Sequence, residues 1–503
     1  MVNFQERATL QHTLAAGFFG RPVLVAGDLI LDRYIWGEVS RISPEAPVPV
    51  VRILRETDRC GGTAHVAVNL ANLGLAPRIC GWVGEDADGQ RLKRLLQGAG
   101  VATEAVHALP DRPTIVKTRI IGGRQQMLRL DLEQTDPAPE AVWTAFVASV
   151  LEQLHRAPLP GAVILSDYGK GTLSEPVCQA IIQAARGLNV PVLVDPKGMD
   201  YHKYRGATAL TPNRRELAEA IPMSPLDLEP LLAAGESLRQ RIDASFLAVT
   251  LSELGIALID GHTPPIRIPA TAQEVFDVSG AGDAVIAVLA AGLTAGFPLP
   301  DALHLANLAG GVVVGKVGTS PIHREELLAA LTSEETQAQA DKVCSREAAL
   351  SRIEGWRHKG ERLVFTNGCF DLLHAGHVTY LEKARKLGNR LIVGLNTDRS
   401  VQAIKGPNRP VIRQEDRARV LAALESVDLV IPFDEPTPIE LIRAVRPAIL
   451  AKGADHTEAG VVGAAESKSW GCRVALIPLE EGRSSSTIMQ HIQSSQGATP
   501  CTS

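Results

Sequence analysis

Short apolar segments alternate along most of the chain with longer stretches in which apolar residues recur at helical spacing. Apolar runs of roughly four to eight residues are typical of buried strands, and strand–helix alternation predicts a mostly parallel sheet. In the first two thirds of the chain, the expected strands are 21–31, 162–166, 191–194, 209–211 and 246–250. The pattern therefore predicts an α/β fold built on a doubly wound sheet.

Two segments depart from this alternation. Residues 34–53 are rich in β-branched side chains and interrupted by prolines, and residues 115–132 alternate around the pair Gly122 and Gly123. A glycine pair between alternating segments predicts a hairpin. We expect the two segments to form a small sheet that projects from the main body, as a lid over a substrate, a dimer surface, or both.

Polar residues follow the expected strands, and ligands of open α/β sheets bind at the carboxyl ends of the strands. Asp28 interrupts an apolar strand, where burial without a ligand would be costly, so we interpret it as a substrate contact. The other polar strand-end positions are Asp32 and Arg41 after the first strand, Lys197 after the third, Asn213, Arg214, Arg215 and Glu216 after the fourth, and Thr250, Ser252 and Gly255 at the fifth.

A glycine-rich stretch, Phe-Asp-Val-Ser-Gly-Ala-Gly-Asp, occupies residues 276–283. Its small residues 280–282 let the backbone approach a phosphate, and the apolar run 284–293 predicts a helix whose N-terminus favours an anion. Asp283 stands at this entrance, where it can accept a proton from a substrate hydroxyl that attacks a phosphoryl group. The alternative is a glycine-rich turn in which Asp283 is the helix N-cap.

A second pair of glycines, Gly61 and Gly62, begins another stretch of small and apolar residues at helical spacing, which contains Asn69. Tight helix packing explains this pattern. Contact between the backbone and a sugar, with Asn69 as a polar contact, explains it equally well, and both interpretations remain open.

Taken in order, these motifs resemble the ribokinase-like sugar kinase family over about residues 20–330. The resemblance implies ATP-dependent phosphorylation of a sugar hydroxyl, with Asp283 as catalytic base. The other implied roles are an anion hole at Gly280, Ala281 and Gly282, ATP binding by Asn213, Arg214, Arg215 and Glu216, a nucleotide edge at Thr250, Ser252 and Gly255, and sugar binding by Asp28, Asp32, Arg41, Gly61, Gly62, Asn69 and Lys197. A hydrated Mg²⁺ is implied, organised by the phosphates and Glu216 without a direct protein ligand. Val278 replaces a threonine common in the family, which puts a monovalent-cation site in doubt.

The polar stretch 332–345 lacks a buried face and is interpreted as a linker or an exposed helix end. The expected organisation is a kinase domain at 1–331, the linker, and a second domain at 346–503.

In the second domain, an expected strand at 363–366 leads to His374 and His377, which share one face of a helical turn. Imidazoles at a helix start can donate hydrogen bonds to a triphosphate and to departing pyrophosphate. Two unrelated polar histidines or a metal pair are the alternatives; a metal pair would need further ligands.

The run His374-Ala375-Gly376-His377 resembles the cytidylyltransferase-like nucleotidyltransferases, over about residues 345–490. This resemblance implies a Rossmann-like domain that transfers a nucleotidyl group and releases pyrophosphate, without a covalent enzyme intermediate. Nucleotide and substrate binding is expected at Gly368, Cys369, Phe370, Asn396, Asp398, Lys452, Gly453, Arg483, Ser484, Ser485, Ser486 and Thr487. Within this set, Cys369 fits packing better than chemistry, and the serine run could also be a helix start with surface serines.

The whole chain resembles the bifunctional heptose enzymes of Gram-negative lipopolysaccharide synthesis. This implies phosphorylation of D-glycero-β-D-manno-heptose 7-phosphate at O1, removal of the 7-phosphate by a separate phosphatase, and adenylylation of heptose 1-phosphate, with ATP used at both sites. One alternative is a kinase joined to a cytidylyltransferase for another sugar or polyol. Another is a nucleotide-sensing scaffold with degenerate sites, against which the intact Asp283, His374 and His377 argue.

Composition restricts the partners. The chain has 503 residues, a hydrophobic fraction of 45% and a net charge of −5, which argues against general binding to nucleic acid or membrane surfaces. Its seven cysteines are dispersed, as expected of reduced thiols in the cytoplasm. We find no signal-peptide pattern and no apolar run of about 18 residues. The expected partners are heptose phosphates, ATP and a second copy of the chain, joined through the lid.

Overall fold

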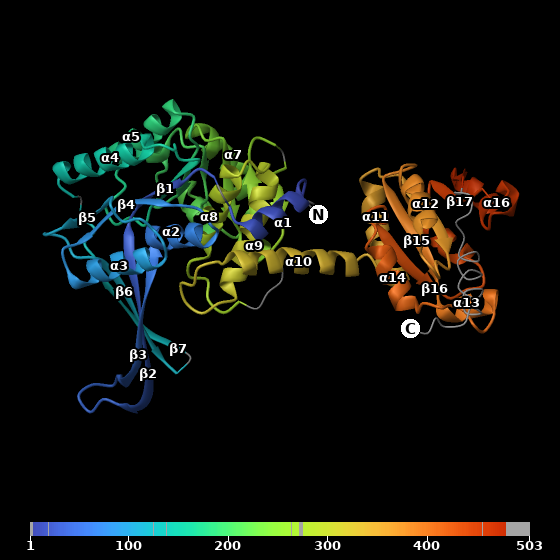
Figure 1. The fold of residues 1–503 in the computed structure, drawn as a ribbon, viewed down its shortest axis with the longest axis horizontal. Helices are drawn as coiled ribbons and strands as arrows, with labels where there is room; N and C mark the ends of the chain where they lie inside the picture. The colour runs from blue at the N-terminus through green and yellow to red at the C-terminus, as the bar shows by residue number, and fades with distance from the viewer. Residues whose placement is uncertain are drawn as a thin grey trace, which may run out of the picture. The chain divides into compact units, whose positions relative to one another are not determined.

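The computed structural model describes residues 4–478, except for 19, 124, 137, 263, 271–274 and 455. The chain forms two compact units, Met1–Thr332 and Ser333–Ser503 (Figure 1). Each unit has its own sheet and its own buried core.

The N-terminal unit is built on a nine-stranded sheet in the order β13-β12-β11-β10-β9-β8-β1-β4-β5. The strands are β1 (Val23–Gly27), β4 (Arg78–Gly84), β5 (Val106–Leu109), β8 (Ala162–Ser166), β9 (Val192–Asp195), β10 (Ala209–Leu210), β11 (Phe246–Thr250), β12 (Ile256–Ile259) and β13 (Ile266–Ile268). All pairs from β11 to β5 are parallel, and β12 and β13 are antiparallel additions at one edge. The parallel strands place their carboxyl ends at the same edge of the sheet, as the sequence predicts.

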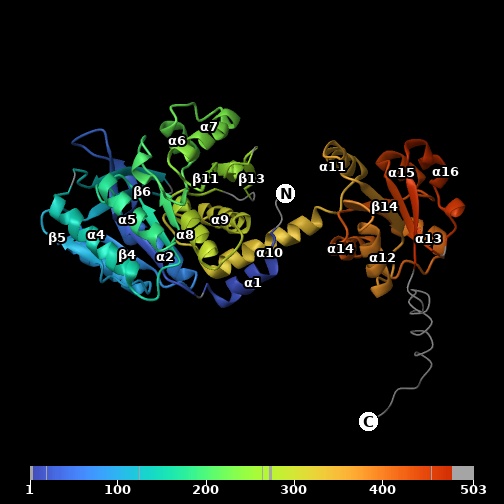
Figure 2. The ribbon, with the colours of Figure 1, turned by 90° about the horizontal axis from the view of Figure 1, so that it is seen from above.

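Helices cover both faces of this sheet (Figures 1 and 2). They are α1 (Arg7–Ala16), α2 (Thr63–Asn72), α3 (Ala87–Gly98), α4 (Glu140–His155), α5 (Glu175–Gly187), α6 (Arg214–Ala220), α7 (Leu228–Arg241), α8 (Ala281–Thr294), α9 (Leu299–Val314) and α10 (Arg324–Ala340). Along β1, Val23 and Val25 belong to the core with α8 and α9, whereas Leu24 and Ala26 belong to the core with α4 and α5. This alternation defines a doubly wound sheet and confirms the expected fold class.

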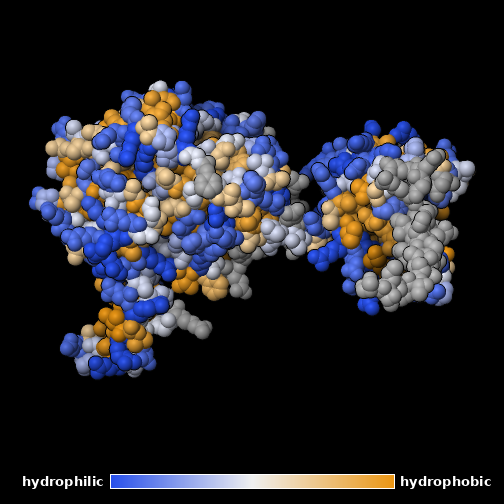
Figure 3. All heavy atoms as spheres, in the orientation of Figure 1, coloured by the Kyte–Doolittle hydropathy of each residue, from blue (hydrophilic) through white to orange (hydrophobic). Residues whose placement is uncertain are grey.

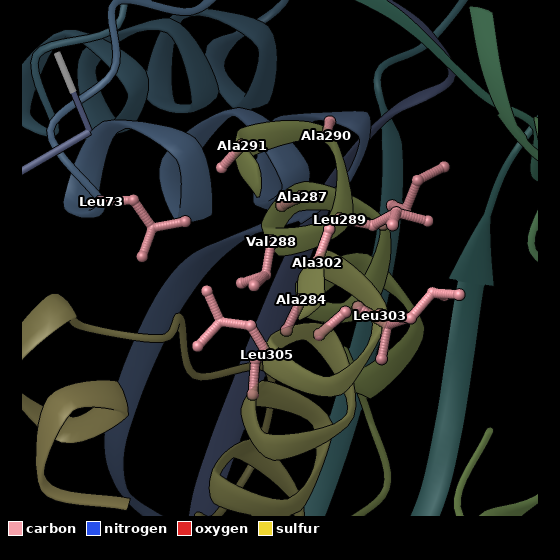
Figure 4. Packing of buried hydrophobic residues seen from close by; sticks show 14 of the residues in the cluster. Leu73, Ala284, Ala287, Val288, Leu289, Ala290, Ala291, Ala302, Leu303 and Leu305 are labelled. Carbon is pink, nitrogen blue, oxygen red and sulfur yellow. The ribbon is translucent and has the colours of Figure 1, made fainter. Parts of the chain in front are cut away.

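Helices α8 and α9 pack closely because small residues line their contact (Figure 4). Ala284, Ala287, Ala291 and Ala302 are completely buried. A Cβ added at Gly292 would lie 2.9 Å from the Cβ of Ala302, so a larger residue there would force the helices apart. This packing fixes the start of α8 against the sheet.

The small sheet has the order β3-β2-β6-β7 and projects from the body of the unit (Figure 1). Its strands are β2 (Leu29–Ile42), β3 (Pro49–Gly62), β6 (Ile115–Gly122) and β7 (Gln125–Leu132). The expected strand 21–31 is in fact two strands, because the chain leaves the main sheet at Asp28 and enters the small sheet. At this bend Gly27 has a φ of 153°, and a Cβ there would lie 2.0 Å from the carbonyl oxygen of Ser166, so only glycine fits.

The C-terminal unit contains a fully parallel five-stranded sheet in the order β16-β15-β14-β17-β18, with helices on both faces (Figure 2). Its strands are β14 (Leu363–Gly368), β15 (Arg390–Asn396), β16 (Leu429–Phe433), β17 (Ile449–Gly453) and β18 (Arg473–Ile477). Its helices are α11 (Arg346–His358), α12 (Ala375–Arg385), α13 (Asp398–Lys405), α14 (Gln414–Ala422), α15 (Ile439–Val445) and α16 (Ala464–Ser467). This architecture confirms the expected Rossmann-like domain, and β14 contains the strand expected at 363–366.

No helix in the described part of the chain is long and apolar enough to cross a membrane. The cysteines of the described ranges are free thiols: Cys60, Cys80, Cys178, Cys344, Cys369 and Cys472.

The expected linker, 332–345, contains the last turns of α10 and a short paired segment. Val343 forms a β-bridge with Val430, and the carbonyl of Lys342 accepts a hydrogen bond from the Val430 backbone. The end of the expected linker is therefore part of the C-terminal unit.

We predict that a cut after Ala340 yields two soluble fragments, each with its own activity, because neither sheet shares a strand with the other. Solubility and separate kinase and nucleotidyl-transfer assays measure this. An insoluble 341–503 fragment beside a soluble full chain would mean that the domains share a core.

Two candidate active sites

The carboxylate of Asp283 lies in the first turn of α8, almost completely buried. Its Oδ2 is 2.9 Å from Nδ1 of His65, and its Oδ1 accepts a 2.5 Å hydrogen bond from the hydroxyl of Tyr168. The N-cap of α8 is Gly280, and α8 has no side-chain cap hydrogen bond. The alternative in which Asp283 is the N-cap is therefore wrong, and its carboxylate instead faces groups from α2 and from the loop after β8.

The backbone before Asp283 is shaped for close approach. Gly280 has a φ of 81°, and a Cβ there would lie 2.6 Å from Cε1 of His65. A Cβ at Gly282 would meet nothing within 4 Å, so the space at the start of α8 is open. The first backbone N–H groups of a helix have no partner within the helix, and they attract anions. This arrangement can hold a phosphoryl group next to the Asp283 carboxylate.

Residues expected to contact ATP gather at the ends of β9, β10 and β11, and Lys197, which was expected to bind the sugar, lies among them. Lys197 Nζ lies 2.9 Å from Oε1 of Glu216. Asn213 caps α6 and forms a capping box with Glu216, with hydrogen bonds of 2.9 and 3.0 Å. Asn213 also pairs with Thr250, the last residue of β11. The structure thus brings Lys197, Asn213, Glu216 and Thr250 together, and it shows a helix-capping role for two of them.

The other expected nucleotide contacts border this group. Arg214 and Arg215 form the first turn of α6, where the Arg215 side chain is exposed. Ser252 and Gly255 lie in the turn after β11, which the Leu251 N–H closes by donating to the Gly255 carbonyl. Gly255 has a φ of 92°, and a Cβ there would lie 2.0 Å from the Ile268 carbonyl oxygen, so the turn requires glycine.

Acidic groups crowd the carboxyl edge of the sheet. Asp195 ends β9, and its pKa is raised well above the ordinary value by burial and then by the negative charge of Asp283. Burial, and next the neighbouring Asp167, also raises the pKa of Asp28. Removing Asp283 therefore leaves other acids nearby, but each sits in a different hydrogen-bond environment.

Three of the residues expected to contact the sugar form hydrogen bonds to other parts of the protein. The Asp28 carboxylate accepts backbone hydrogen bonds from Tyr168, Lys170 and Thr172, at 2.9, 3.1 and 3.2 Å. Asp32 lies 2.5 Å from Arg119 and 2.9 Å from the Thr319 hydroxyl. Asn69 is completely buried and accepts a 2.7 Å hydrogen bond from the Ile322 backbone.

The remaining expected sugar contacts are Gly61, Gly62 and Arg41. A Cβ at Gly61 would lie 2.4 Å from Oδ2 of Asp32, and Gly62 is the N-cap of α2 with a φ of 56°. These contacts support tight packing. Arg41 is exposed and lies further along β2 than Asp32 by roughly 30 Å, at about 3.3 Å per residue. Within one chain, the structure does not bring Arg41 to the other site residues.

In the C-terminal unit, the loop after β14 leads to His374, the N-cap of α12, and to His377 in its first turn. The two imidazole rings lie 4.0 Å apart between centroids, and the Phe370 ring is 5.4 Å from that of His377. Burial, followed by the nearby His374 and Lys405, lowers the pKa of His377 to about 4. His377 is therefore neutral at pH 7 and donates from one ring nitrogen only, a restriction that the sequence analysis did not anticipate.

Arg417, a residue that the sequence analysis did not identify, organises the loops around the histidines. Its side chain is completely buried. The guanidinium donates to the carbonyls of Cys369 and Asn396, at 2.5 and 2.9 Å, and to that of Ile412 at 3.0 Å. It also pairs with Asp398 at 2.7 Å. One cation thus ties the ends of β14 and β15 to the start of α14.

The expected nucleotide-binding residues of this unit lie at the carboxyl ends of β14, β15 and β17. Lys452 Nζ donates to the Asn367 carbonyl at 3.0 Å, and Gly453 ends β17. A Cβ at Gly368 would lie 3.1 Å from the Phe370 ring. Burial raises the pKa of Cys369, which fits a packing thiol. Arg483, Ser484, Ser485, Ser486 and Thr487 lie outside the described residues.

The kinase site contains two functional candidates that the sequence analysis missed, His65 and Tyr168. His65 stood in what looked like an ordinary buried helix, and only the fold brings it to Asp283. Tyr168 follows β8 directly, in the run Asp-Tyr-Gly-Lys-Gly, so its strand-end position was a usable signal. Within the described ranges, no group of three or more His, Cys, Asp or Glu residues could hold a metal ion.

Comparison with known proteins agrees with this geometry. Residues 23–325 match the pfkB family of carbohydrate kinases, and residues 365–491 match the cytidylyltransferase-like family. Escherichia coli phosphofructokinase-2, solved with substrates and products, superimposes with a TM-score of 0.53 at 18% identity, covering 62% of this chain and 99% of that one, which shows the shared fold. The fold and sites thus define a carbohydrate kinase joined to a nucleotidyltransferase.

Full-length relatives share both units. The bifunctional protein HldE of Methylobacillus flagellatus is 57% identical, covering 94% of this chain and 96% of the relative. That of Magnetococcus marinus is also 57% identical, covering 96% and 99%. The chain belongs to the bifunctional HldE family, which confirms the family expected from the sequence.

We predict that Arg417→Met destabilises the C-terminal unit by about 3–5 kcal/mol, because it removes the donor to three carbonyls, including that of the buried Asn396, and leaves Asp398 without its cation. Thermal unfolding of the full chain, together with nucleotidyl-transfer activity, measures the loss. Arg419→Met, on the exposed side of the same helix, is the matched control. Equal melting temperatures for the two variants would contradict the role assigned to Arg417.

Proposed function

We propose that the residues at the two sites carry out two steps of ADP-heptose synthesis, between which a separate phosphatase removes the 7-phosphate. The N-terminal unit is a heptose 7-phosphate kinase that uses ATP, and the C-terminal unit is a heptose 1-phosphate adenylyltransferase that releases pyrophosphate. Membership of the HldE family supports both activities. The observation that supports the kinase assignment most directly is that the buried Asp283 carboxylate follows Gly282, where an added Cβ would meet nothing within 4 Å.

In the kinase step, the sugar is D-glycero-β-D-manno-heptose 7-phosphate and the acceptor is its O1 hydroxyl. Asp283 takes the proton of that hydroxyl as the oxygen attacks the γ-phosphorus. The backbone N–H groups at 280–282 stabilise the transferred phosphoryl, and Lys197, Asn213, Glu216 and Thr250 border the nucleotide. Mg²⁺, when bound with ATP, neutralises phosphate charge; the partly exposed Glu216 carboxylate at this edge fits a role in holding its water shell.

In the adenylyl step, the phosphate of heptose 1-phosphate attacks the α-phosphorus of ATP. The N-terminus of α12, with His374 and His377, stabilises the charge that builds on pyrophosphate as it leaves. A neutral His377 still offers one N–H with which to donate a hydrogen bond to the leaving pyrophosphate. Family membership favours adenine, whereas the histidine motif itself only holds phosphates.

We propose that the protein works in the cytoplasm as a homodimer joined through the small sheet. Hydrophobic residues gather on the projecting part of the N-terminal unit (Figure 3). The exposed large hydrophobic residues of the small sheet and of the β2–β3 connection include Ile42, Val48, Ile53, Leu54, Leu128, Leu130 and Leu132. A patch of exposed hydrophobic side chains with polar residues around it is typical of an interface. The dispersed free thiols fit a reducing compartment.

Replacing both Ile53 and Leu54 by Asp should convert the dimer to a monomer, because two charges would then have to be buried in the interface. Mass measured by light scattering during gel filtration tests this. Leu226→Asp, at a residue 83% exposed on the body of the unit, is the control. A wild-type chain that is already monomeric would contradict the proposed dimer interface.

Asp283→Asn should lower the kinase rate by about 10²–10⁴-fold, because the amide keeps the shape of the carboxylate but cannot take the proton. The adenylyltransferase should keep its rate, since it lies in the other unit. Release of ADP from ATP with heptose 7-phosphate, and of pyrophosphate with heptose 1-phosphate, measures the two activities. Kinase activity within a few fold of wild type would exclude Asp283 as the base.

His374→Ala and His377→Ala should lower the turnover of the adenylyltransferase on the order of 10²–10³-fold, with a smaller effect on the Michaelis constant for ATP. The reason is that the charge on the leaving pyrophosphate is greater in the transition state than in bound ATP. Pyrophosphate release with ATP and with CTP measures both claims. Faster reaction with CTP contradicts the adenylyl assignment, and unchanged turnover means that the histidines only bind substrate.

A further inference from the structure

His65 is a buried, titratable residue with no role in the chemistry described above. It lies in the first turn of α2, and its side chain is 1% exposed. Its Nδ1 is 2.9 Å from Oδ2 of Asp283. Its Nε2 is buried and has no hydrogen-bond partner in the described part of the chain. A histidine placed in this way is directed at one target, the carboxylate of the catalytic base.

The contact fixes where the proton of His65 lies. Asp283 must be ionised to act as a base, and an ionised carboxylate only accepts hydrogen bonds. Nδ1 therefore carries a hydrogen and donates it. A second N–H, on Nε2, would be a buried donor without a partner, which is unfavourable. His65 is thus a neutral imidazole with its proton on Nδ1.

Tyr168 completes the arrangement from another element. Its hydroxyl donates to Oδ1 of Asp283, while His65 donates to Oδ2. Burial, followed by the charge of Asp283, raises the pKa of Tyr168 well above its ordinary value, so its hydroxyl keeps its proton. Two donors on opposite oxygens prevent rotation of the carboxylate. Each oxygen keeps a further lone pair with which to accept a proton.

We propose that His65 is a positioning residue of the kinase, which holds the Asp283 carboxylate in the orientation that receives the proton of the sugar hydroxyl. The inference rests on the proposed role of Asp283 as the base. His65 keeps its proton throughout, and the proton of the sugar passes to Asp283 alone. The imidazole also packs beneath the anion site, because a Cβ at Gly280 would lie 2.6 Å from its Cε1.

Other charged and titratable groups face Asp283 from the elements packed around α8. They are Tyr168 after β8, which donates to Asp283, and Asp195 at the end of β9, which interacts with its charge. A negative charge on Asp195 disfavours a further negative charge on Asp283, whereas the hydrogen bonds from His65 and Tyr168 favour the ionised form of the base. Without the donor at residue 65, the kinase should need a higher pH to reach full activity.

Two substitutions separate hydrogen bonding from packing. In asparagine, Nδ2 is as many bonds from Cβ as Nδ1 is in histidine, so His65→Asn keeps a donor near Asp283 and removes the ring. His65→Phe keeps an aromatic ring beneath Gly280 and removes the donor. A purely structural role for His65 predicts that phenylalanine is the better replacement, whereas a positioning role predicts asparagine.

The test uses the full-length chain, with the kinase rate measured from about pH 5.5 to 8.5 and the adenylyltransferase activity of the same sample as the control for protein concentration. His65→Phe should lower the kinase kcat on the order of 10–100-fold, with both Michaelis constants within about threefold of wild type, and it should move the acid limb of the profile up by about one pH unit. His65→Asn should stay within about fivefold of wild type, with its acid limb in place.

The opposite order of the two variants, or an equal loss in both with an unshifted acid limb, would overturn the proposal. If both variants lose most of their activity, the pH profile of the residual rate is compared. An acid limb shifted up in His65→Phe alone supports the proposal, and an unshifted limb in that variant overturns it. Asp283→Asn in the same series tests the role of Asp283 as the base separately from the role of His65. Retained activity in that variant overturns the assignment of the base itself, whereas its loss together with an unshifted limb in His65→Phe overturns only the role of His65.

Discussion

The burial of the Asp283 carboxylate at the start of α8 is the constraint on which the kinase unit depends. A buried charge is stable only when hydrogen bonds replace the water that it loses. Here His65 and Tyr168 supply those bonds from two different elements. The close packing of α8 on α9 through alanines and Gly292 then holds the helix start in place. The same backbone therefore places the Asp283 carboxylate at the N-terminus of α8, beside the proposed anion site.

The C-terminal unit meets a related requirement with the opposite charge. Its buried ion is Arg417, whose guanidinium satisfies three carbonyls and Asp398. His377 in the first turn of α12 is neutral at pH 7, because burial and the neighbouring His374 and Lys405 lower its pKa to about 4. In both units, the proposed phosphate contact lies at a helix N-terminus, beside the carboxyl ends of parallel strands.

Much of this organisation is encoded in local patterns of the sequence. Alternating strands and helices, the glycines before α8 and the two histidines of α12 are read from spacing alone. The roles of Asp28 and Asn69 could not be read in this way, because their partners are backbone groups more than a hundred residues away. His65 and Arg417 were missed for the same reason: each resembles an ordinary helical residue until the fold brings its partners to it. The bend at Asp28 depends on Gly27 lying against Ser166, a contact between neighbouring strands that no local pattern records.

A crystal structure of the full chain with heptose 7-phosphate and a non-hydrolysable ATP analogue tests the central claim most directly. The account predicts that the sugar O1 lies about 2.6–3.2 Å from the Asp283 carboxylate, with the γ-phosphate at the backbone N–H groups of 280–282. His65 and Tyr168 should still donate to the two carboxylate oxygens. An O1 hydroxyl placed against Asp195 instead, or a γ-phosphate away from the start of α8, would contradict it.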